Sequence, residues 1–134
     1  MVRIHGQRSA TPPMEDLALT PVMDLPFLEE ARRLVSGLKL AEEMVDYVVD
    51  LVRSTRNHPA LQVGASPRAA NMLAVAARAA AVLEGRSFVI PDDVKLVFLP
   101  VMRHRLVLSP GAELEGRSPD EVLGRILDQV SAPR

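Results

Sequence analysis

The chain has 134 residues, which suits one domain and allows roughly two-thirds of the unfolded surface to be buried. Apolar residues make up 48% and aromatic residues only 3%, so the core must be built mainly from aliphatic side chains. The 16 Lys and Arg residues nearly balance the 17 Asp and Glu residues, which argues against a polybasic nucleic-acid binder or a membrane-surface protein. The absence of cysteine excludes disulfides, thiolate-bound metals and thiol catalysis. No stretch approaches the ~20 apolar residues of a membrane span, and we expect a cytoplasmic domain.

The N-terminal segment shows no sustained hydrophobic periodicity and is interrupted by prolines. We therefore expect residues 1–24 to be a linker or an arm upstream of the domain, with residual helix near Met1–Gly6. From Leu25 the pattern becomes helical, and Gly37 is typical of a helix end. The apolar positions of this first helix are Phe27, Leu28, Ala31, Leu34 and Val35.

Residues 41–57 carry a stronger amphipathic pattern, which predicts a second helix with a wide buried stripe. Its start is poorly capped, because Ala41 stands where Ser, Thr or Asp is preferred. The segment Asn57-His58-Pro59 should end the helix. We expect the buried stripe to consist of Met44, Val45, Val48, Leu51, Val52 and Thr55.

A third helix is predicted over residues 67–83, with Ser66 as its N-cap and Pro67 at its first position. This helix contains eight alanines, and so many small side chains indicate close approach by neighbouring helices. We expect its packed face to carry Leu73, Ala76, Ala80 and Leu83. The turn Glu84-Gly85-Arg86 follows it.

Two further helices complete the pattern. One begins at Pro91-Asp92-Asp93, where the helix dipole favours acidic residues, and Pro100 inside it predicts a kink or break near Phe98. The other begins at the capping box Ser118-Pro119-Asp120-Glu121. No segment alternates apolar and polar residues for long enough to form a sheet. The sequence therefore predicts an all-α fold, a small bundle of about five helices.

Common catalytic and phosphate-binding motifs are absent, since the sequence lacks GxxxxGK[ST], GxGxxG, HExxH and GxSxG. The three histidines, His5, His58 and His104, lie on separate segments without metal-ligand spacing. The adjacent acidic pairs Glu42-Glu43 and Asp92-Asp93 point apart on a helix, so we interpret them as solvated caps. We expect no metal site and no catalysis by this chain alone.

Arginines are frequent enough to suggest a DNA-binding surface of the helix-turn-helix kind. The candidates are Arg53, Arg56, Arg68, Arg78, Arg86, Arg103 and Arg105. Acidic residues interleave with them, however, and no helix shows a dense cationic face with base-reading Asn or Gln. A small DNA-binding helical protein is therefore the less favoured alternative.

Arg68 is unusual because it occupies the first turn of a predicted helix, where the helix dipole disfavours a cation. The free N–H groups of a helix N-terminus attract anions, and an arginine beside them adds to that attraction. Ser66-Pro67-Arg68 would therefore form a phosphate-sensing point. The outward polar stripe of this helix is expected at Arg68, Asn71, Val75 and Arg78. The alternative is an ordinary exposed arginine that bonds to a neighbouring helix.

Six segments also carry a resemblance to a known family: Leu51–Arg56, Gly64–Ala69, Glu84–Arg86, Phe88–Val94, Arg103–Leu106 and Glu113–Arg117. In this order and spacing they resemble the C-terminal helical lid of MoxR-type AAA+ ATPases. The similarity covers roughly residues 25–130. It is specific because the segments occur together, and any one of them alone would be weak.

The resemblance implies that Gly64–Arg68 opens the helix carrying the sensor 2 arginine, which points from the lid into the nucleotide site of a preceding α/β domain. Arg68 would then meet the γ-phosphate of ATP, with Pro67 and Ala69 beside it. The family assembles as hexameric rings with chaperone-like roles, and its partners often include proteins with a von Willebrand factor A domain. Neither nucleic acid nor membrane is implied as a partner.

The sequence also departs from the family pattern. The α/β domain that would hold ATP with magnesium is absent, so residues 25–134 look like a lid without its ATPase core. Ile90 replaces the hydroxyl residue that usually caps the Pro91 helix. We expect the isolated chain to bind ATP weakly or not at all. The alternative to a nucleotide-responsive lid is a free-standing helical protein-interaction module.

Overall fold

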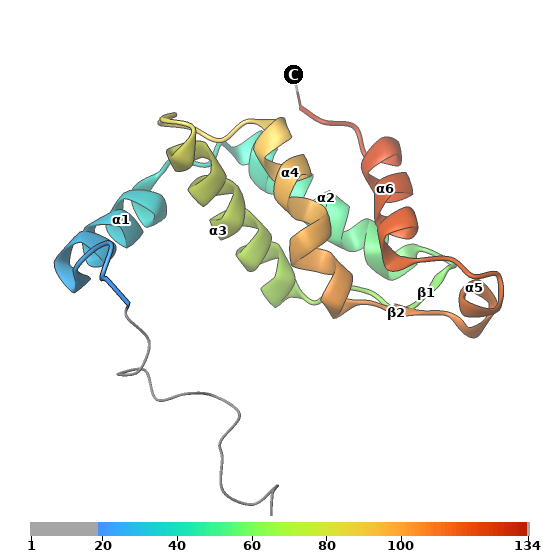
Figure 1. The fold of residues 1–134 in the computed structure, drawn as a ribbon. Helices are drawn as coiled ribbons and strands as arrows, with labels where there is room; N and C mark the ends of the chain where they lie inside the picture. The colour runs from blue at the N-terminus through green and yellow to red at the C-terminus, as the bar shows by residue number, and fades with distance from the viewer. Residues whose placement is uncertain (1–18, 134) are drawn as a thin grey trace, which may run out of the picture.

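The computed structural model describes residues 19–133, which fold into six α-helices, a 3-10 helix and a small two-stranded sheet (Figure 1). The helices are α1 (Leu25–Gly37), α2 (Glu42–Asn57), α3 (Pro67–Leu83), α4 (Pro91–Met102), α5 (Pro110–Leu114) and α6 (Pro119–Gln129). The 3-10 helix η2 spans Arg103–Arg105, and the strands are β1 (Leu61–Val63) and β2 (Val107–Leu108). This architecture confirms the predicted all-α fold. The helix expected near Met1–Gly6 lies outside the described residues.

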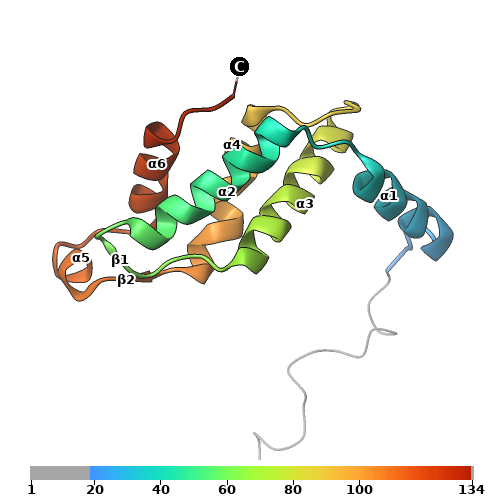
Figure 2. The same cartoon turned by 180° about the vertical axis from the view of Figure 1, so that it is seen from behind.

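Four helices, α2, α3, α4 and α6, surround the hydrophobic core, and α3 packs most extensively against α4 (Figure 2). Phe98 on α4 is the largest fully buried side chain, and most of the others are aliphatic, including Leu51, Leu73 and Leu123. The core is therefore aliphatic, as the composition predicts. None of the helices in residues 19–133 combines the length and hydropathy that a membrane crossing requires.

The predicted stripe of α2 is correct except at its edge. Tyr47 is buried at 3% exposure, whereas Val45 is 43% exposed, so the expectation for Val45 was wrong. The buried positions recur every three or four residues from Met44 to Thr55, and Val45 lies just outside that arc. Ala41 is the N-cap and makes no side-chain capping hydrogen bond, as predicted.

The packed face of α3 differs from the predicted one. Its buried residues are Ala69, Leu73, Ala77, Ala80 and Ala81. Ala76 is only half-buried, and Leu83 is 86% exposed at the last position before the turn, where the chain leaves the helix. Small side chains on the buried face let α4 approach closely, which explains the alanine content.

Of the kink or break predicted near Phe98, the break does not occur, because α4 continues through Pro100. The helix continues without interruption to Met102, and the N–H of Arg103 still donates to the carbonyl of Leu99. A proline in the last turn removes a single backbone hydrogen bond, and here that loss lies close to where the helix ends.

The acidic start of α4 is only partly solvated. Asp93 was expected to be a solvated cap, but it is 3% exposed and forms a two-pronged ion pair with Arg86. Its Oδ2 atom also accepts a hydrogen bond from the N–H of Ile90 at 2.9 Å. The Arg86 hydrogen bonds, helped by the Ile90 bond and opposed by burial, hold the pKa of Asp93 below its usual value. Asp93 therefore fixes the turn that joins α3 to α4.

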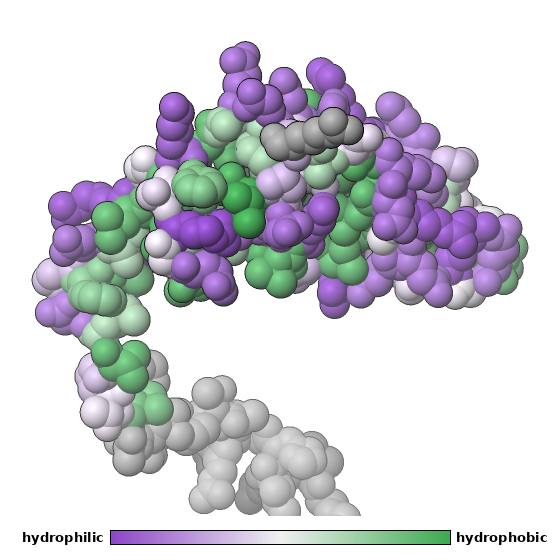
Figure 3. Space-filling model, turned by 90° about the horizontal axis from the view of Figure 1, so that it is seen from above, coloured by the Kyte–Doolittle hydropathy of each residue, from purple (hydrophilic) through white to green (hydrophobic). Residues whose placement is uncertain are grey.

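α1 stands apart from the bundle. It follows the predicted boundaries and is capped by Asp24, whose Oδ1 atom accepts a hydrogen bond from the N–H of Phe27 at 2.9 Å. None of its residues is fully buried, and it packs against α3. Figure 3 shows apolar surface over α1 among polar side chains.

The small sheet and α5 were not predicted. β1 and β2 pair antiparallel, with Leu61 opposite Leu108 and Val63 opposite Val107. The N–H of Ser109 extends the pairing by donating to the carbonyl of Ala60 at 2.9 Å. Strands this short carry no readable alternation, but the pairing ties the α2–α3 connection to the segment that follows α4.

Candidate functional site

Arg68 lies where the sequence places it, in the exposed first turn of α3. Among residues 19–133 its side chain makes no ion pair, and its backbone N–H has no hydrogen-bond partner. Ser66 is the N-cap by position, but its hydroxyl accepts no hydrogen bond from the helix. The first turn of α3 therefore offers the free N–H of Arg68 beside its own unpaired guanidinium, which is a favourable arrangement for an anion.

The position of this helix start is set by the end of α2. The hydroxyl of Thr55 donates to the carbonyl of Val52 at 2.7 Å and accepts the N–H of Ala65 at 2.9 Å. The Nε of Arg56 donates to the carbonyl of Ala65 at 2.6 Å. Both hydrogen-bonding groups of Ala65 are thus held by neighbouring residues of α2.

Gly64 allows this contact because it has no side chain. A Cβ atom added there would lie 2.5 Å from the Cα of Arg56 and 2.7 Å from the carbonyl oxygen of Thr55. No side chain can occupy that space without moving backbone. Thr55, Arg56, Gly64 and Ala65 form what we call the α2–α3 clasp, and it places Pro67 and Arg68 at a defined position.

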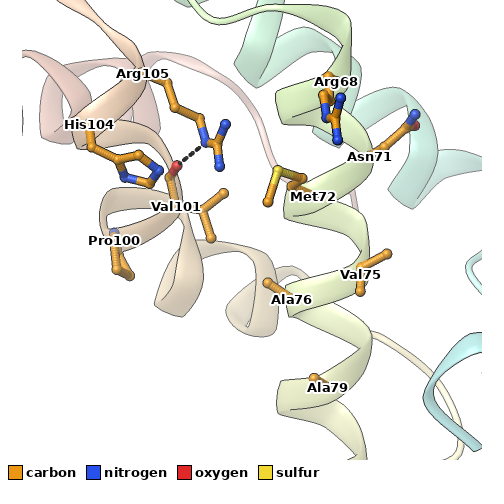
Figure 4. Close-up of a pocket in the computed structure, with 10 residues that line it drawn as sticks. All are labelled: Arg68, Asn71, Met72, Val75, Ala76, Ala79, Pro100, Val101, His104 and Arg105. Atoms are coloured by element: carbon orange, nitrogen blue, oxygen red, sulfur yellow. Dashed lines mark hydrogen bonds between the residues drawn. The ribbon is translucent and has the colours of Figure 1, made fainter. Parts of the chain in front are cut away.

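A groove of about 610 Å³ runs between α3 and α4. We call it the α3–α4 groove, and Figure 4 shows its lining residues. Three basic residues lie at one end of it, namely Arg68, His104 and Arg105, and no acidic residue lines it. The Nε of Arg105 donates to the carbonyl of Val101 at 3.0 Å. The rest of the lining is mainly apolar, from Met72, Val75, Ala76, Ala79, Pro100 and Val101.

A second, smaller groove of about 340 Å³ lies on the other side of the α3 start, against α2. Its lining includes Arg53, Arg56 and Pro67, and Asn71 lines both grooves. The first turns of α3 therefore form a ridge with arginines on either side. No acidic side chain of the described chain lines this second groove either.

The three site residues predicted from the sequence lie in different environments. Arg68 and Pro67 are exposed on the ridge, each beside a different groove. Ala69 is fully buried, and its N–H donates to the carbonyl of Ser66 at 2.9 Å. The side chain of Ala69 therefore belongs to the core.

The predicted outward stripe of α3 is correct for its first three members and wrong for the fourth. Arg68, Asn71 and Val75 are exposed, whereas Arg78 is half-buried. The Nε of Arg78 is buried and has no hydrogen-bond partner among residues 19–133. Arg78 therefore does not belong to the exposed stripe that carries Arg68.

Sequence reasoning missed the roles of Thr55, Arg56 and Gly64 in the clasp, and of His104 and Arg105 in the α3–α4 groove. Gly64 lies two residues before the predicted cap Ser66, and that position was a usable signal for a close backbone approach. The Nδ1 of His58 accepts a hydrogen bond from the N–H of Ala60 at 3.2 Å, in the connection between α2 and β1. Burial lowers the pKa of His58. Within the described chain, no three His, Asp or Glu residues cluster as a metal site would require.

The comparisons with known proteins agree on one family. The family model described as the AAA lid domain matches residues 53–126. YeaC of Bacillus subtilis is 36% identical over 118 residues, covering 86% of this chain and 36% of YeaC. Chaperone MoxR1 of Mycobacterium tuberculosis is 42% identical over 100 residues, covering 68% of this chain and 26% of MoxR1.

A solved structure, a putative ATPase from Cytophaga hutchinsonii, superposes with a TM-score of 0.74 at 31% identity. The match covers 78% of this chain and 34% of that protein. The chain thus spans about a third of the length of the first of these relatives and of this structure, and about a quarter of MoxR1.

Proposed function

Since this chain belongs to the AAA lid domain family, we propose that it serves as the C-terminal lid of a MoxR-type AAA+ ATPase. Residues 25–134 are the lid, and residues 1–24 are the arm that precedes it. In this function the lid performs no chemistry. It couples ATP binding and hydrolysis in an adjoining α/β domain to a change of conformation in a chaperone-like ring.

We assign the role of sensor 2 to Arg68. The observation that supports this is an exposed, unpaired arginine in the first turn of a helix whose start is fixed by the α2–α3 clasp. A guanidinium contacts phosphate oxygens through two parallel N–H donors. The γ-phosphate exists only before hydrolysis, so an arginine delivered by the lid reports nucleotide state as lid closure.

ATP fits this assignment, and magnesium needs ligands from elsewhere. The ridge offers guanidinium and N–H donors suited to phosphate, while neither groove beside it carries a carboxylate in the described chain. Magnesium prefers oxygen ligands, so the adjoining α/β domain supplies its site. In the whole protein we further propose ring neighbours, a cytoplasmic location and a partner with a von Willebrand factor A domain.

The test is a chimera in which this chain replaces the matching region of Chaperone MoxR1, after the parent chimera has been shown to hydrolyse ATP. Arg68→Ala should lower ATP turnover by ten-fold or more, because one charge-assisted phosphate contact contributes ~1.5–3 kcal/mol. Arg68→Lys should restore little, since a lysine lacks the planar fork.

The matched control is Arg125→Ala, an exposed arginine on α6 that lies outside both grooves. It should leave turnover within two-fold of the parent. Wild-type turnover in Arg68→Ala would reject the sensor assignment and leave Arg68 as an ordinary surface arginine.

A further inference from the structure

The turn that follows α4 carries two arginines, and they have different partners. Arg103 has an acidic partner, because its Nη2 atom lies 3.3 Å from the Oδ2 atom of Asp120 on α6. It also lies outside the lining of the α3–α4 groove. Arg105 is half-buried, lines the groove and forms no ion pair among residues 19–133. Of the two arginines, only Arg105 brings an uncompensated charge into the groove.

The guanidinium of Arg105 is held in one orientation. Its Nε donates to the carbonyl of Val101 at 3.0 Å, one turn back on α4. That bond uses the edge of the guanidinium next to the stem, and neither of the two terminal Nη groups donates to an acceptor within the described chain. Figure 4 shows the side chain extending from the end of α4 toward α3. The terminal Nη groups are the parallel pair of donors that a phosphate accepts through two oxygens.

Arg105 and Arg68 stand on opposite walls of the same end of the groove. α4 packs along α3 so that its end lies beside the start of α3 (Figure 1). The rest of the lining is mainly apolar and includes no acidic side chain. Two cations that share such a groove repel each other, and the positive end of the α3 dipole adds to the same potential. An anion between the two walls removes this repulsion.

We infer that Arg105 is a second nucleotide-binding residue of the lid and contacts the γ-phosphate of ATP from the wall opposite Arg68. This inference rests on the proposed function, because the adjoining α/β domain must hold the nucleotide against this end of the lid. The γ-phosphate has enough charge and oxygen acceptors for more than one guanidinium, and ADP lacks it. Arg105 therefore helps the lid to distinguish ATP from ADP.

The alternative is that Arg105 only caps α4. A cation near the C-terminal end of a helix is favourable, and so is its bond to one of the last carbonyls. Arg103 makes the same kind of bond, from its Nε to the carbonyl of Leu99 at 3.4 Å. Capping thus accounts for the Nε bond of both arginines. It does not account for the free Nη groups that Arg105 presents to a groove without acidic residues.

The test uses the chimera with Chaperone MoxR1 and measures equilibrium affinities for a non-hydrolysable ATP analogue and for ADP, both with magnesium. Arg105→Ala should weaken binding of the analogue about ten-fold and binding of ADP less than about two-fold, because only the analogue has a γ-phosphate. Arg105→Lys should recover part of the loss, since lysine keeps the charge and lacks the fork. An unchanged Tm will show that each variant is folded.

Arg103→Ala is the matched control. It removes an arginine from the same turn, with the same kind of Nε bond, whose guanidinium is paired with Asp120 outside the groove. Both affinities of this variant should stay within about two-fold of the parent chimera.

Equal losses of affinity for the analogue and for ADP in Arg105→Ala would overturn the inference and assign Arg105 to a contact with protein. Unchanged affinities would overturn it as well and leave Arg105 as the cap of α4. Either result leaves the sensor assignment in place if Arg68→Ala still lowers ATP turnover. Conversely, wild-type turnover in Arg68→Ala rejects the sensor assignment, whereas a selective loss of analogue binding in Arg105→Ala still supports the phosphate contact of Arg105.

Discussion

α1 and α2 carry the same kind of apolar periodicity but have different environments. In α2 six residues are buried, and the helix packs against α3, α6 and the β1 strand. In α1 no residue is fully buried, and its main neighbour is α3. Periodicity thus predicts that a helix forms and which face is apolar, while the number of neighbouring elements decides how much of that face is covered.

The comparison extends to function. The end of α2 is fixed to the start of α3 through Thr55, Arg56 and Ala65, and that fixed junction positions Arg68. α1 packs against α3 through half-buried side chains and has no fully buried residue. The proposed nucleotide contact therefore lies in the part of the molecule where neighbouring helices are joined by side-chain hydrogen bonds.

The same substitution in the two helices should give very different losses of stability. Leu51 in α2 is fully buried, so Leu51→Ala should lower the free energy of unfolding by about 3 kcal/mol. Leu34 in α1 is 61% exposed, so Leu34→Ala should change it by less than about 0.5 kcal/mol. Urea unfolding of both variants in dilute solution measures the difference. Equal losses would mean that α1 is as well covered as α2.

The α2–α3 clasp can be broken by a single methyl group. Gly64→Ala should lower the free energy of unfolding by about 2–3 kcal/mol, because the new Cβ would overlap the backbone of Arg56. Gly124→Ala on α6 is the control, since a Cβ there meets nothing within 4 Å and alanine favours a helix. Thermal unfolding should show Gly124→Ala at or above the wild-type Tm. A Gly64→Ala variant with the wild-type Tm would mean that the clasp is not tight.

The fold was predictable as far as local patterns determine it. The boundaries of α1 and α3, the capping box of α6 and the poor cap at Ala41 all follow from residues near one another in sequence. Two errors are local, namely the break expected at Pro100 and the missed helix α5, and the others concern contacts between distant segments. Burial of Tyr47 in place of Val45 depends on where α2 meets its neighbours, and two short strands pair only because the chain brings them together.

The site was predictable to a smaller extent. Arg68 could be singled out because a cation in the first turn of a helix is locally unfavourable. The hydrogen bonds that join Ala65 to Thr55 and Arg56 connect residues nine or ten positions apart, and no local pattern indicates them. Arg105 lies beside Arg68 along the groove only because α3 and α4 pack together, so its place could not be read from sequence.

A second fixed junction, between α3 and α4, should show a pH dependence that α1 lacks. Asp93 has its pKa lowered chiefly by the Arg86 hydrogen bonds, so its contribution to stability is present above the unfolded pKa of about 4. That contribution is lost as pH falls through the lower, folded pKa, because protonation breaks the ion pair.

Asp93→Asn should therefore lower the free energy of unfolding by about 2 kcal/mol at pH 7, a reduced value because Arg86 is partly exposed to solvent. The difference from wild type should shrink as pH falls below about 4, since both proteins then carry a neutral group at residue 93. Asp24→Asn on α1 is the control and should shift stability little, because asparagine also caps a helix start. Urea unfolding at a series of pH values measures both. A difference between Asp93→Asn and wild type that stays constant down to pH 2 would show that the Asp93 carboxylate charge is not what holds the α3–α4 junction.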